Sequence, residues 1–151
     1  MKARTILSSL FFLLLTSTWP LMAQDSYMFK HLDTKNGLSN SQVNYIFKDS
    51  KGFMWFGTAS GLNRYDGYNY KIFRHKESIG HSIADNFVDL IQEDADGNLW
   101  IHTGVGYVFF DSKKEVFVNN LAEIMKGFGI NHIPSVVYID EDKNFWFYMM
   151  N

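Results

Sequence analysis

The chain repeats one stretch of sequence about every 45 residues, and this repeat constrains its fold more than any other feature. "DSKGFMWFGTASGLNRYDG" begins at Asp49, "DADGNLWIHTGVGYVFFD" begins at Asp94, and a fainter copy, "DEDKNFWFYMMN", begins at Asp140. A unit that cannot bury its own faces is expected to stack against copies of itself. The structural repeat positions are Asp49, Gly52, Trp55, Thr58 and Gly61 in the first copy, Asp94, Gly97, Trp100, Thr103 and Gly106 in the second, and Asp140 and Trp146 in the third.

The first and most complete copy has the pattern of a four-stranded antiparallel sheet. In the first, turn residues separate "VNYIFKD", "FMWFGT", "LNRYD" and "YKIFR", which are rich in β-branched and aromatic residues. Runs such as "FMWF" and "YVFF" are apolar on both faces, which is typical of a sheet covered on both sides. The sequence therefore predicts an all-β fold, a partial β-propeller of about two complete four-stranded blades plus a half blade. We place blade 1 at 43–74, blade 2 at 87–118 and an incomplete blade 3 at 136–151.

The repeated residue types indicate roles in the fold. The repeated tryptophans are expected to be wedges between neighbouring sheets, with ligand stacking as the alternative. The repeated aspartates open a turn by accepting backbone N–H groups, and the glycines that follow supply a positive φ. Lys143 replaces this glycine in the third copy. Either the third turn takes another form, or Lys143 adopts a conformation that is unfavourable for a residue with a side chain.

The N-terminus has the pattern of a secretory signal peptide at 1–23, followed by a segment at 24–42 with one strand near Phe29–Leu32. Lys2 and Arg4 precede an apolar run, and Ala23 ends the segment. We expect cleavage there, with an uncleaved membrane anchor as the alternative. The remaining 128 residues have a formal charge of −4 and no cysteine. The predicted location is periplasmic, without disulfides, and the absence of a basic stripe excludes nucleic acid as a partner.

No motif indicates catalysis, a metal or a cofactor. "DSKGFMW" comes close to the Asp box of sialidases, but that box is a turn element rather than a catalytic group. A glycosidase needs two converging carboxylates, and the acidic residues here fall mostly in equivalent turns. "DADGN" has its glycine too early for a calcium loop, and Val105 stands where a bidentate Glu would be. The prediction is a chain with no enzyme activity, no cofactor and no metal.

Two further segments carry hypotheses. Tyr65, Tyr68 and Tyr70 surround a "DGYN" turn, and flat aromatic rings suit sugar faces, so they are candidates for glycan stacking. Cross-strand aromatic pairing within a blade explains them equally well. A short helix is expected at Leu121–Lys126, with Asn120 as its cap and a small packing face.

The first copy resembles a known family. "NGLSNSQVNYIFKDSKGFMWFGTASGLNRYDGYNYKIF" is similar to the first propeller repeat of the extracytoplasmic sensor region of hybrid two-component systems, the sensor kinase/response regulator proteins of glycan-degrading Gram-negative bacteria. Blade 2 departs from the repeat pattern at His102 and Tyr107, and blade 3 departs at Tyr148 and Met149. The resemblance covers residues 28–151.

This resemblance implies a periplasmic region of two many-bladed propellers, an immunoglobulin-like domain, a membrane helix, a histidine kinase and a response regulator with a DNA-binding output. It also implies an oligosaccharide ligand, a second sensor chain as partner, and signal transduction by phosphorelay to control transcription. Because this sequence has no counterpart of the kinase elements and stops inside a blade at Asn151, we expect an N-terminal fragment of such a sensor, or a truncated reading frame. Such a fragment would not signal by itself, and would meet the membrane only through an uncleaved signal or a missing downstream helix. The alternative function is a non-catalytic secreted propeller scaffold that binds a protein partner or a glycan.

Overall fold

The computed structural model describes residues 29–150, so the predicted signal peptide lies outside the described residues. The chain divides into two compact units, Met1–His31 and Leu32–Asn151, and almost all of the described residues belong to the second. Its strands are β1 (Val43–Lys48), β2 (Met54–Thr58), β3 (Gly61–Tyr65), β4 (Tyr70–Phe73), β5 (Val88–Glu93), β6 (Leu99–Thr103), β7 (Gly106–Asp111), β8 (Val116–Val118), β9 (Val136–Ile139) and β10 (Phe145–Tyr148). A 3-10 helix, η1 (Thr34–Asn36), precedes them, and the α-helix α2 (Leu121–Gly127) precedes β9.

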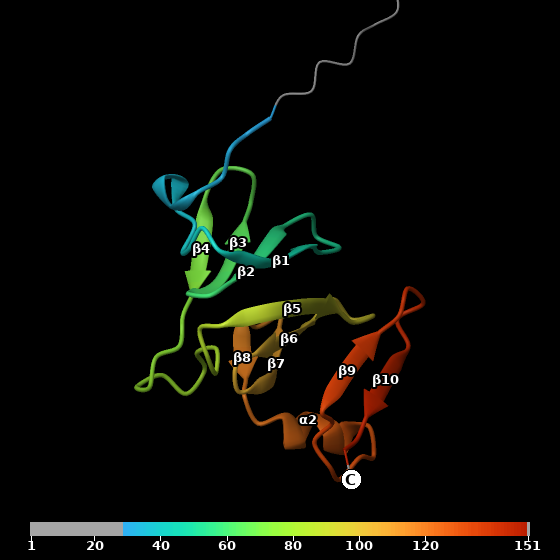
Figure 1. Ribbon diagram of the computed structural model, residues 1–151. Helices are drawn as coiled ribbons and strands as arrows, with labels where there is room; N and C mark the ends of the chain where they lie inside the picture. Colours follow the sequence, from blue (N-terminus) through green and yellow to red (C-terminus); the bar gives the residue numbers. More distant parts are fainter. Residues whose placement is uncertain (1–28, 151) are drawn as a thin grey trace, which may run out of the picture. The chain divides into compact units, whose positions relative to one another are not determined.

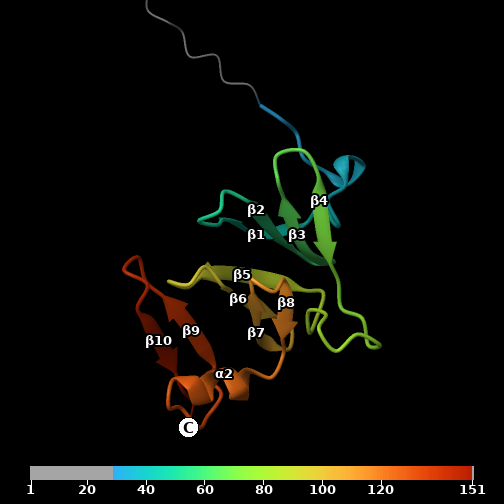
Figure 2. The ribbon, with the colours of Figure 1, turned by 180° about the vertical axis from the view of Figure 1, so that it is seen from behind.

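The strands form three antiparallel sheets in chain order (Figures 1 and 2). Strands β1 to β4 make blade 1, strands β5 to β8 make blade 2, and strands β9 and β10 make the half blade 3. Within each sheet, every strand pairs with the next along the chain, because short turns bring neighbouring strands together as antiparallel partners. The predicted fold class, an all-β partial propeller with two complete blades and a half blade, is confirmed.

The blades pack through alternating faces of their strands. In β6, Leu99 and Ile101 face the core shared with blade 1, whereas Trp100 between them faces the core shared with blade 3. Side chains of successive residues point to opposite faces of a strand, so one strand supplies both cores. The apolar runs on both faces of these strands are therefore explained by burial on both sides. The α2 residues Leu121 and Met125 are buried in the second core.

Blades 1 and 2 share an irregularity at the same repeat position. The register of β1 against β2 shifts between Val43 and Tyr45, and that of β5 against β6 shifts between Val88 and Leu90. In blade 1 the residue inside the shift is Asn44, whose side-chain amide donates to the backbone oxygen of Val88 at 3.0 Å. The irregularity therefore directs a polar side chain towards the neighbouring blade.

The strand expected near Phe29–Leu32 is wrong. No strand forms between residues 29 and 42, and the segment instead holds η1, whose first turn is closed by a capping box between Asp33 and Asn36. A strand requires a partner strand for its backbone hydrogen bonds. In the described sheets, the ten strands pair only among themselves, so none of them is a partner for residues 29–32. Leu38 packs with Phe56 on the face of blade 1 that points away from blade 2.

The helix predicted at Leu121–Lys126 forms and is one residue longer, ending at Gly127. The expected cap is absent, because the side chain of Asn120 makes no capping hydrogen bond. Its packing face is buried by blade 2 and blade 3 rather than by the helix's own sequence neighbours.

Candidate functional site

Three aspartates at the starts of equivalent turns each bind two groups of the chain. One oxygen of Asp49 accepts the backbone N–H of Phe53 at 2.8 Å, and the other accepts the indole N–H of Trp55 at 2.7 Å. The same pair of bonds recurs from Asn98 and Trp100 to Asp94 at 2.9 and 3.3 Å, and from Asn144 and Trp146 to Asp140 at 2.8 and 2.9 Å. We call this arrangement the aspartate-tryptophan turn. It closes each hairpin turn and fixes the orientation of the indole ring that follows.

The third turn has the same form as the first two. Gly52 and Gly97 have φ of 91° and 79°, and Lys143 has φ of 65° at the equivalent position. Its backbone N–H donates to the carbonyl of Asp140, as that of Gly52 donates to the carbonyl of Asp49. Of the two possibilities for Lys143, the structure therefore shows the unfavourable conformation in an unchanged turn.

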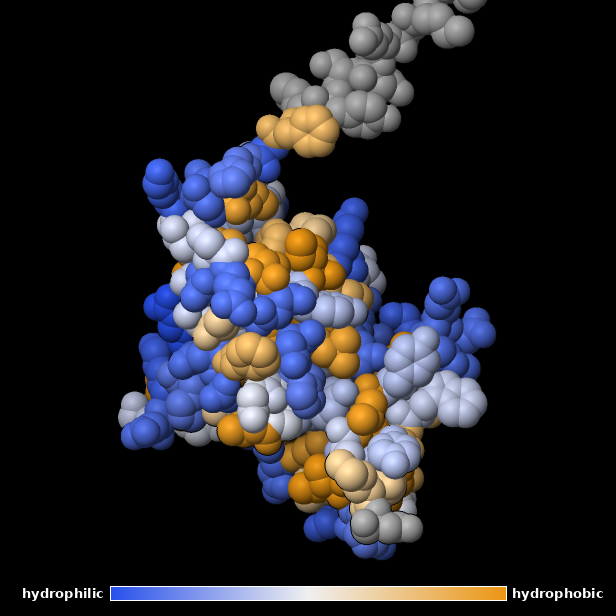
Figure 3. Space-filling view, in the orientation of Figure 1, coloured by the Kyte–Doolittle hydropathy of each residue, from blue (hydrophilic) through white to orange (hydrophobic). Residues whose placement is uncertain are grey.

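The three indole rings differ in burial. Trp55 and Trp100 are each 1% exposed, because the next blade covers the face that carries them. Trp146 is 62% exposed on the outer face of blade 3, beside its cross-strand partner Tyr138. In the space-filling view, pale aromatic side chains gather over β9 and β10 (Figure 3). The wedge role therefore holds for the first two tryptophans and not for the third within residues 29–150.

The repeated threonines and glycines close the turn between the second and third strands of a blade. The hydroxyl of Thr58 donates to the carbonyl of Gly61 at 2.8 Å, and that of Thr103 donates to the carbonyl of Gly106 at 2.6 Å. Both glycines have positive φ, 125° and 116°. In blade 1 they also make contacts outside the sheet: the Thr58 hydroxyl lies 2.9 Å from that of Ser39, and the backbone N–H of Gly61 donates to the carbonyl of Asn86 at 2.7 Å.

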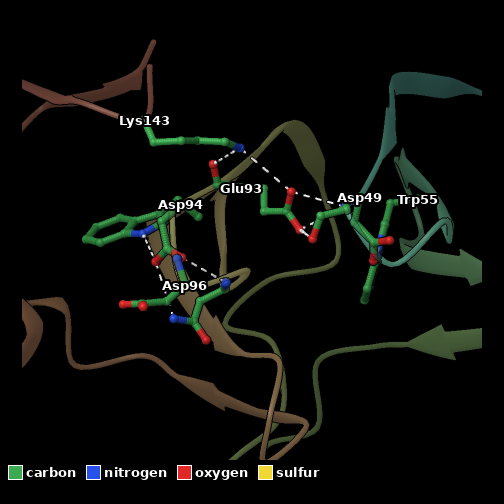
Figure 4. A network of polar contacts seen from close by, with 9 residues as sticks. Asp49, Trp55, Glu93, Asp94, Asp96 and Lys143 are labelled. Atoms are coloured by element: carbon green, nitrogen blue, oxygen red, sulfur yellow. Dashed lines mark hydrogen bonds and ion pairs between the residues drawn. The ribbon is translucent and has the colours of Figure 1, made fainter. Parts of the chain in front are cut away.

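Glu93 joins the turns of all three blades (Figure 4). Its buried carboxylate accepts the backbone N–H and the hydroxyl of Ser50 from blade 1, at 3.0 and 2.8 Å. From blade 3, the Lys143 ammonium donates to the Glu93 carbonyl at 2.9 Å and lies 3.7 Å from its carboxylate. This polar network lies beside the aspartate-tryptophan turns and holds neighbouring blades in register.

The chemistry of these turns is structural. The carboxylates of Asp49 and Asp94 are buried and their oxygens accept hydrogen bonds, so neither is available as a base or a ligand. The Trp146 indole, followed by the backbone N–H of Asn144, holds the pKa of the Asp140 carboxyl below its ordinary value. Within residues 29–150, no group of three or more His, Asp or Glu side chains is arranged to hold a metal. None of the helices in this part of the chain is long and apolar enough to cross a membrane.

The structure does not bring the three candidate tyrosines onto one surface. Tyr65 is 8% exposed and its hydroxyl donates to the carbonyl of Gly67. Tyr70 packs against it, with ring centroids 4.7 Å apart in a cross-strand pair. Only Tyr68 is open to a ligand, at 88% exposure. Cross-strand pairing thus accounts for two of the three residues.

Two polar contacts of blade 2 are not predicted by the repeat pattern. His102 lies 2.7 Å from Asp89 and contacts the ring of Tyr107, and burial raises the pKa of Tyr107. Gln92 binds the backbone of β9 twice, donating to Val137 at 2.9 Å and accepting from Ile139 at 2.8 Å. The departure of His102 from the glycine of the repeat was the one available signal for the first contact.

The two four-stranded sheets and the two-stranded sheet, each with its aspartate-tryptophan turn, define a partial β-propeller built from repeats. Residues 37–60 and 82–104 match the two-component regulator propeller family. These segments hold the first two strands of blade 1 and of blade 2, so the chain carries two-component regulator propeller repeats.

The chain is similar to one curated protein and to two solved structures described next. "Histidine kinase P4" from Formosa agariphila is 42% identical over 65 residues, which cover 42% of this chain and 5% of that protein. The extracellular domain of a putative hybrid two-component system from B. thetaiotaomicron is 26% identical over 62% of this chain and 13% of that one, with a TM-score of 0.49. A second such domain is 18% identical over 81% of this chain and 24% of that one, with a TM-score of 0.42. The match therefore spans about a twentieth of the length of the curated relative.

Proposed function

We propose that this chain forms part of the periplasmic ligand-sensing region of a hybrid two-component sensor, with an oligosaccharide as the ligand. The observation that carries the proposal is the match of two successive hairpins to two-component regulator propeller repeats. The 42% identity to a histidine kinase over 65 residues supports a sensor rather than an unrelated propeller. The chain's own part is non-catalytic, because the repeated carboxylates bind backbone and indole N–H groups.

Tyr68 is the residue we propose for stacking on a sugar ring. It lies on the β3–β4 turn, where the carboxylate of Asp66 accepts the backbone N–H groups of Tyr68 and Asn69 at 2.8 and 2.6 Å. These bonds fix the turn while leaving the ring open to solvent. A ring carried on a turn whose backbone is already fixed loses less entropy on binding a flat sugar face.

Titration of the purified chain with a panel of oligosaccharides tests the ligand class, with calorimetry as the readout. Tyr68→Ala should abolish binding, whereas Tyr148→Ala, which removes another exposed tyrosine ring on blade 3, should leave binding unchanged. Fractionation of cells that express the chain tests the location. Absence of binding across the panel would contradict the ligand, and retention in the cytoplasm would contradict the location.

The exposed face of blade 3 favours the second candidate, a scaffold that binds a protein partner. Val136, Tyr138, Trp146 and Tyr148 form a cross-strand quartet whose side chains are all exposed. A contiguous apolar and aromatic face of this kind is typical of interaction surfaces. Co-purification of one protein that is lost in Tyr138→Asp, together with no oligosaccharide binding, would favour the scaffold.

A further inference from the structure

The contact between blades 1 and 2, the first junction, holds an internal cation above its tryptophan. The Arg64 guanidinium lies 4.6 Å from the ring centroid of Phe53 and 5.6 Å from that of Trp55. Glu115 of blade 2 accepts hydrogen bonds from Arg64 and from Lys71. Aromatic rings and a carboxylate thus enclose a guanidinium that the chain itself provides.

The contact between blades 2 and 3, the second junction, lacks this cation. The repeat places Phe109 at the position of Arg64 and Asn98 at that of Phe53. The structure confirms that Arg64 and Phe109 are equivalent. Arg64 is the cross-strand partner of Trp55 between β2 and β3, and Phe109 is that of Trp100 between β6 and β7. Among residues 29–150, no lysine or arginine lines the second junction beside Trp100, although Lys143 of blade 3 lies elsewhere in the same junction, on Glu93.

A cavity of about 290 Å³ lies at this place in the second junction. Its walls include the side chains of Trp100, Phe109, Ile124, Phe128 and Phe145, and Asp96 lies at its polar side. The rings of Phe109, Phe128 and Phe145 each contact Trp100, with centroids 5.5, 6.1 and 5.2 Å from it. The cavity is therefore an aromatic box built around the tryptophan of blade 2.

Asp96 supplies a carboxylate to the lining of this cavity. Its neighbour Asp94 accepts the N–H groups of Asn98 and Trp100, but within residues 29–150 the exposed Asp96 carboxylate has no hydrogen bond or ion pair. Figure 4 shows both residues on the same turn. The equivalent residue in blade 1 is Lys51, so the charge of this position is reversed between the two junctions.

We propose that the cavity of the second junction binds a small guanidinium compound, which makes there the kinds of contact that Arg64 makes in the first junction. The aromatic walls and the Asp96 carboxylate supply the two kinds of contact that Arg64 makes with rings and with Glu115. An anion is disfavoured because two carboxylates and no base line the cavity. A sugar is disfavoured because its several hydroxyls would need several convergent polar groups, and the side chains of Asp94 and Asn98 are already bonded. This proposal is independent of the oligosaccharide site at Tyr68.

The test uses the full chain, with N-acetylarginine amide as the probe and the neutral N-acetylcitrulline amide as its matched control. The indole N–H signals of the four tryptophans are followed by NMR during titration. We expect the Trp100 signal to shift with the arginine probe, and binding of the citrulline compound to be at least about tenfold weaker because it lacks the cation.

Asp96→Asn should weaken binding of the arginine probe about two- to fivefold, the size of an exposed ion pair. Asp142→Asn is the control, because Asp142 is the equivalent exposed residue of blade 3 and lies outside the cavity. Phe109→Arg, which places a guanidinium of the chain in the cavity, should abolish binding. Equal binding of the two probes, an unchanged affinity in Asp96→Asn, or a shift of Trp146 without Trp100 would each overturn the proposal.

Discussion

The indole N–H of Trp55 donates to a carboxylate oxygen of Asp49, six residues earlier, at 2.7 Å in the interior of the protein. The other oxygen of the same carboxylate holds the backbone of the turn at Phe53. One side chain therefore couples the closure of a hairpin to the position of the ring that fills the space between two blades. Water cannot replace the bond from Trp55, because Asp49 and Trp55 are both buried.

Asp49→Ala should lower the free energy of unfolding by about 2–4 kcal/mol, because it removes two hydrogen bonds and leaves a buried indole N–H without an acceptor. Urea denaturation followed by circular dichroism measures the loss. Asp140→Ala is the matched control: its turn makes the same bonds at the surface, where water can replace them, so a smaller loss is expected. Equal losses would show that burial does not set the strength of these bonds.

Trp55→Ala and Trp100→Ala should each cost about 3–5 kcal/mol, the usual effect of deleting a large buried aromatic ring. The same denaturation measurement applies. Trp146→Ala should cost much less, because its ring is 62% exposed. A loss below about 1 kcal/mol at Trp55 or Trp100 would instead place these rings in solvent and revive ligand stacking as their role.

The sheets could be predicted because their signals are local and repeated. Turn residues such as Gly52 recur at equivalent places, and apolar runs between them have the length of strands. The strand near Phe29–Leu32 failed because a run of strand-forming residues does not reveal whether a partner strand is present. Likewise, nothing in the spacing of Tyr65 and Tyr70 distinguishes a buried cross-strand pair from a sugar-binding pair.

The contacts between blades could not be predicted from the sequence, because they join residues that are far apart in it. Glu93 and Ser50, or Gln92 and Val137, are about one repeat apart, and neither pair has a distinctive local pattern. The partners of Glu93 and Gln92 depend on which groups of the neighbouring blade lie opposite them. Sequence repetition predicts that the blades meet, whereas the individual hydrogen bonds differ from one junction to the next.

Two substitutions of Lys143 distinguish the effect of backbone strain from that of the side-chain contact. Lys143→Ala should destabilise the chain, since it loses the bond to the Glu93 carbonyl and keeps a side chain at positive φ. Lys143→Gly loses the same bond but relieves the backbone, so it should be more stable than Lys143→Ala by about 1 kcal/mol. Thermal unfolding of the two variants measures this difference. Identical stabilities would mean that the turn relaxes and that no strain resides at this position.

The Glu115 carboxylate is expected to stabilise the folded protein down to acidic pH. Hydrogen bonds from Lys71, then from Arg64, lower the pKa of its carboxyl to about 2 from the ordinary 4.5. Because the folded pKa is the lower one, the contribution is fully present above about pH 4.5 and is lost as the pH falls towards 2. The carboxylate is partly exposed, so the effect should remain below about 1 kcal/mol and should weaken with salt. Unfolding free energies of the wild type and Glu115→Gln should therefore differ at pH 6 and converge near pH 2, whereas a constant difference would place the contribution in packing rather than in charge.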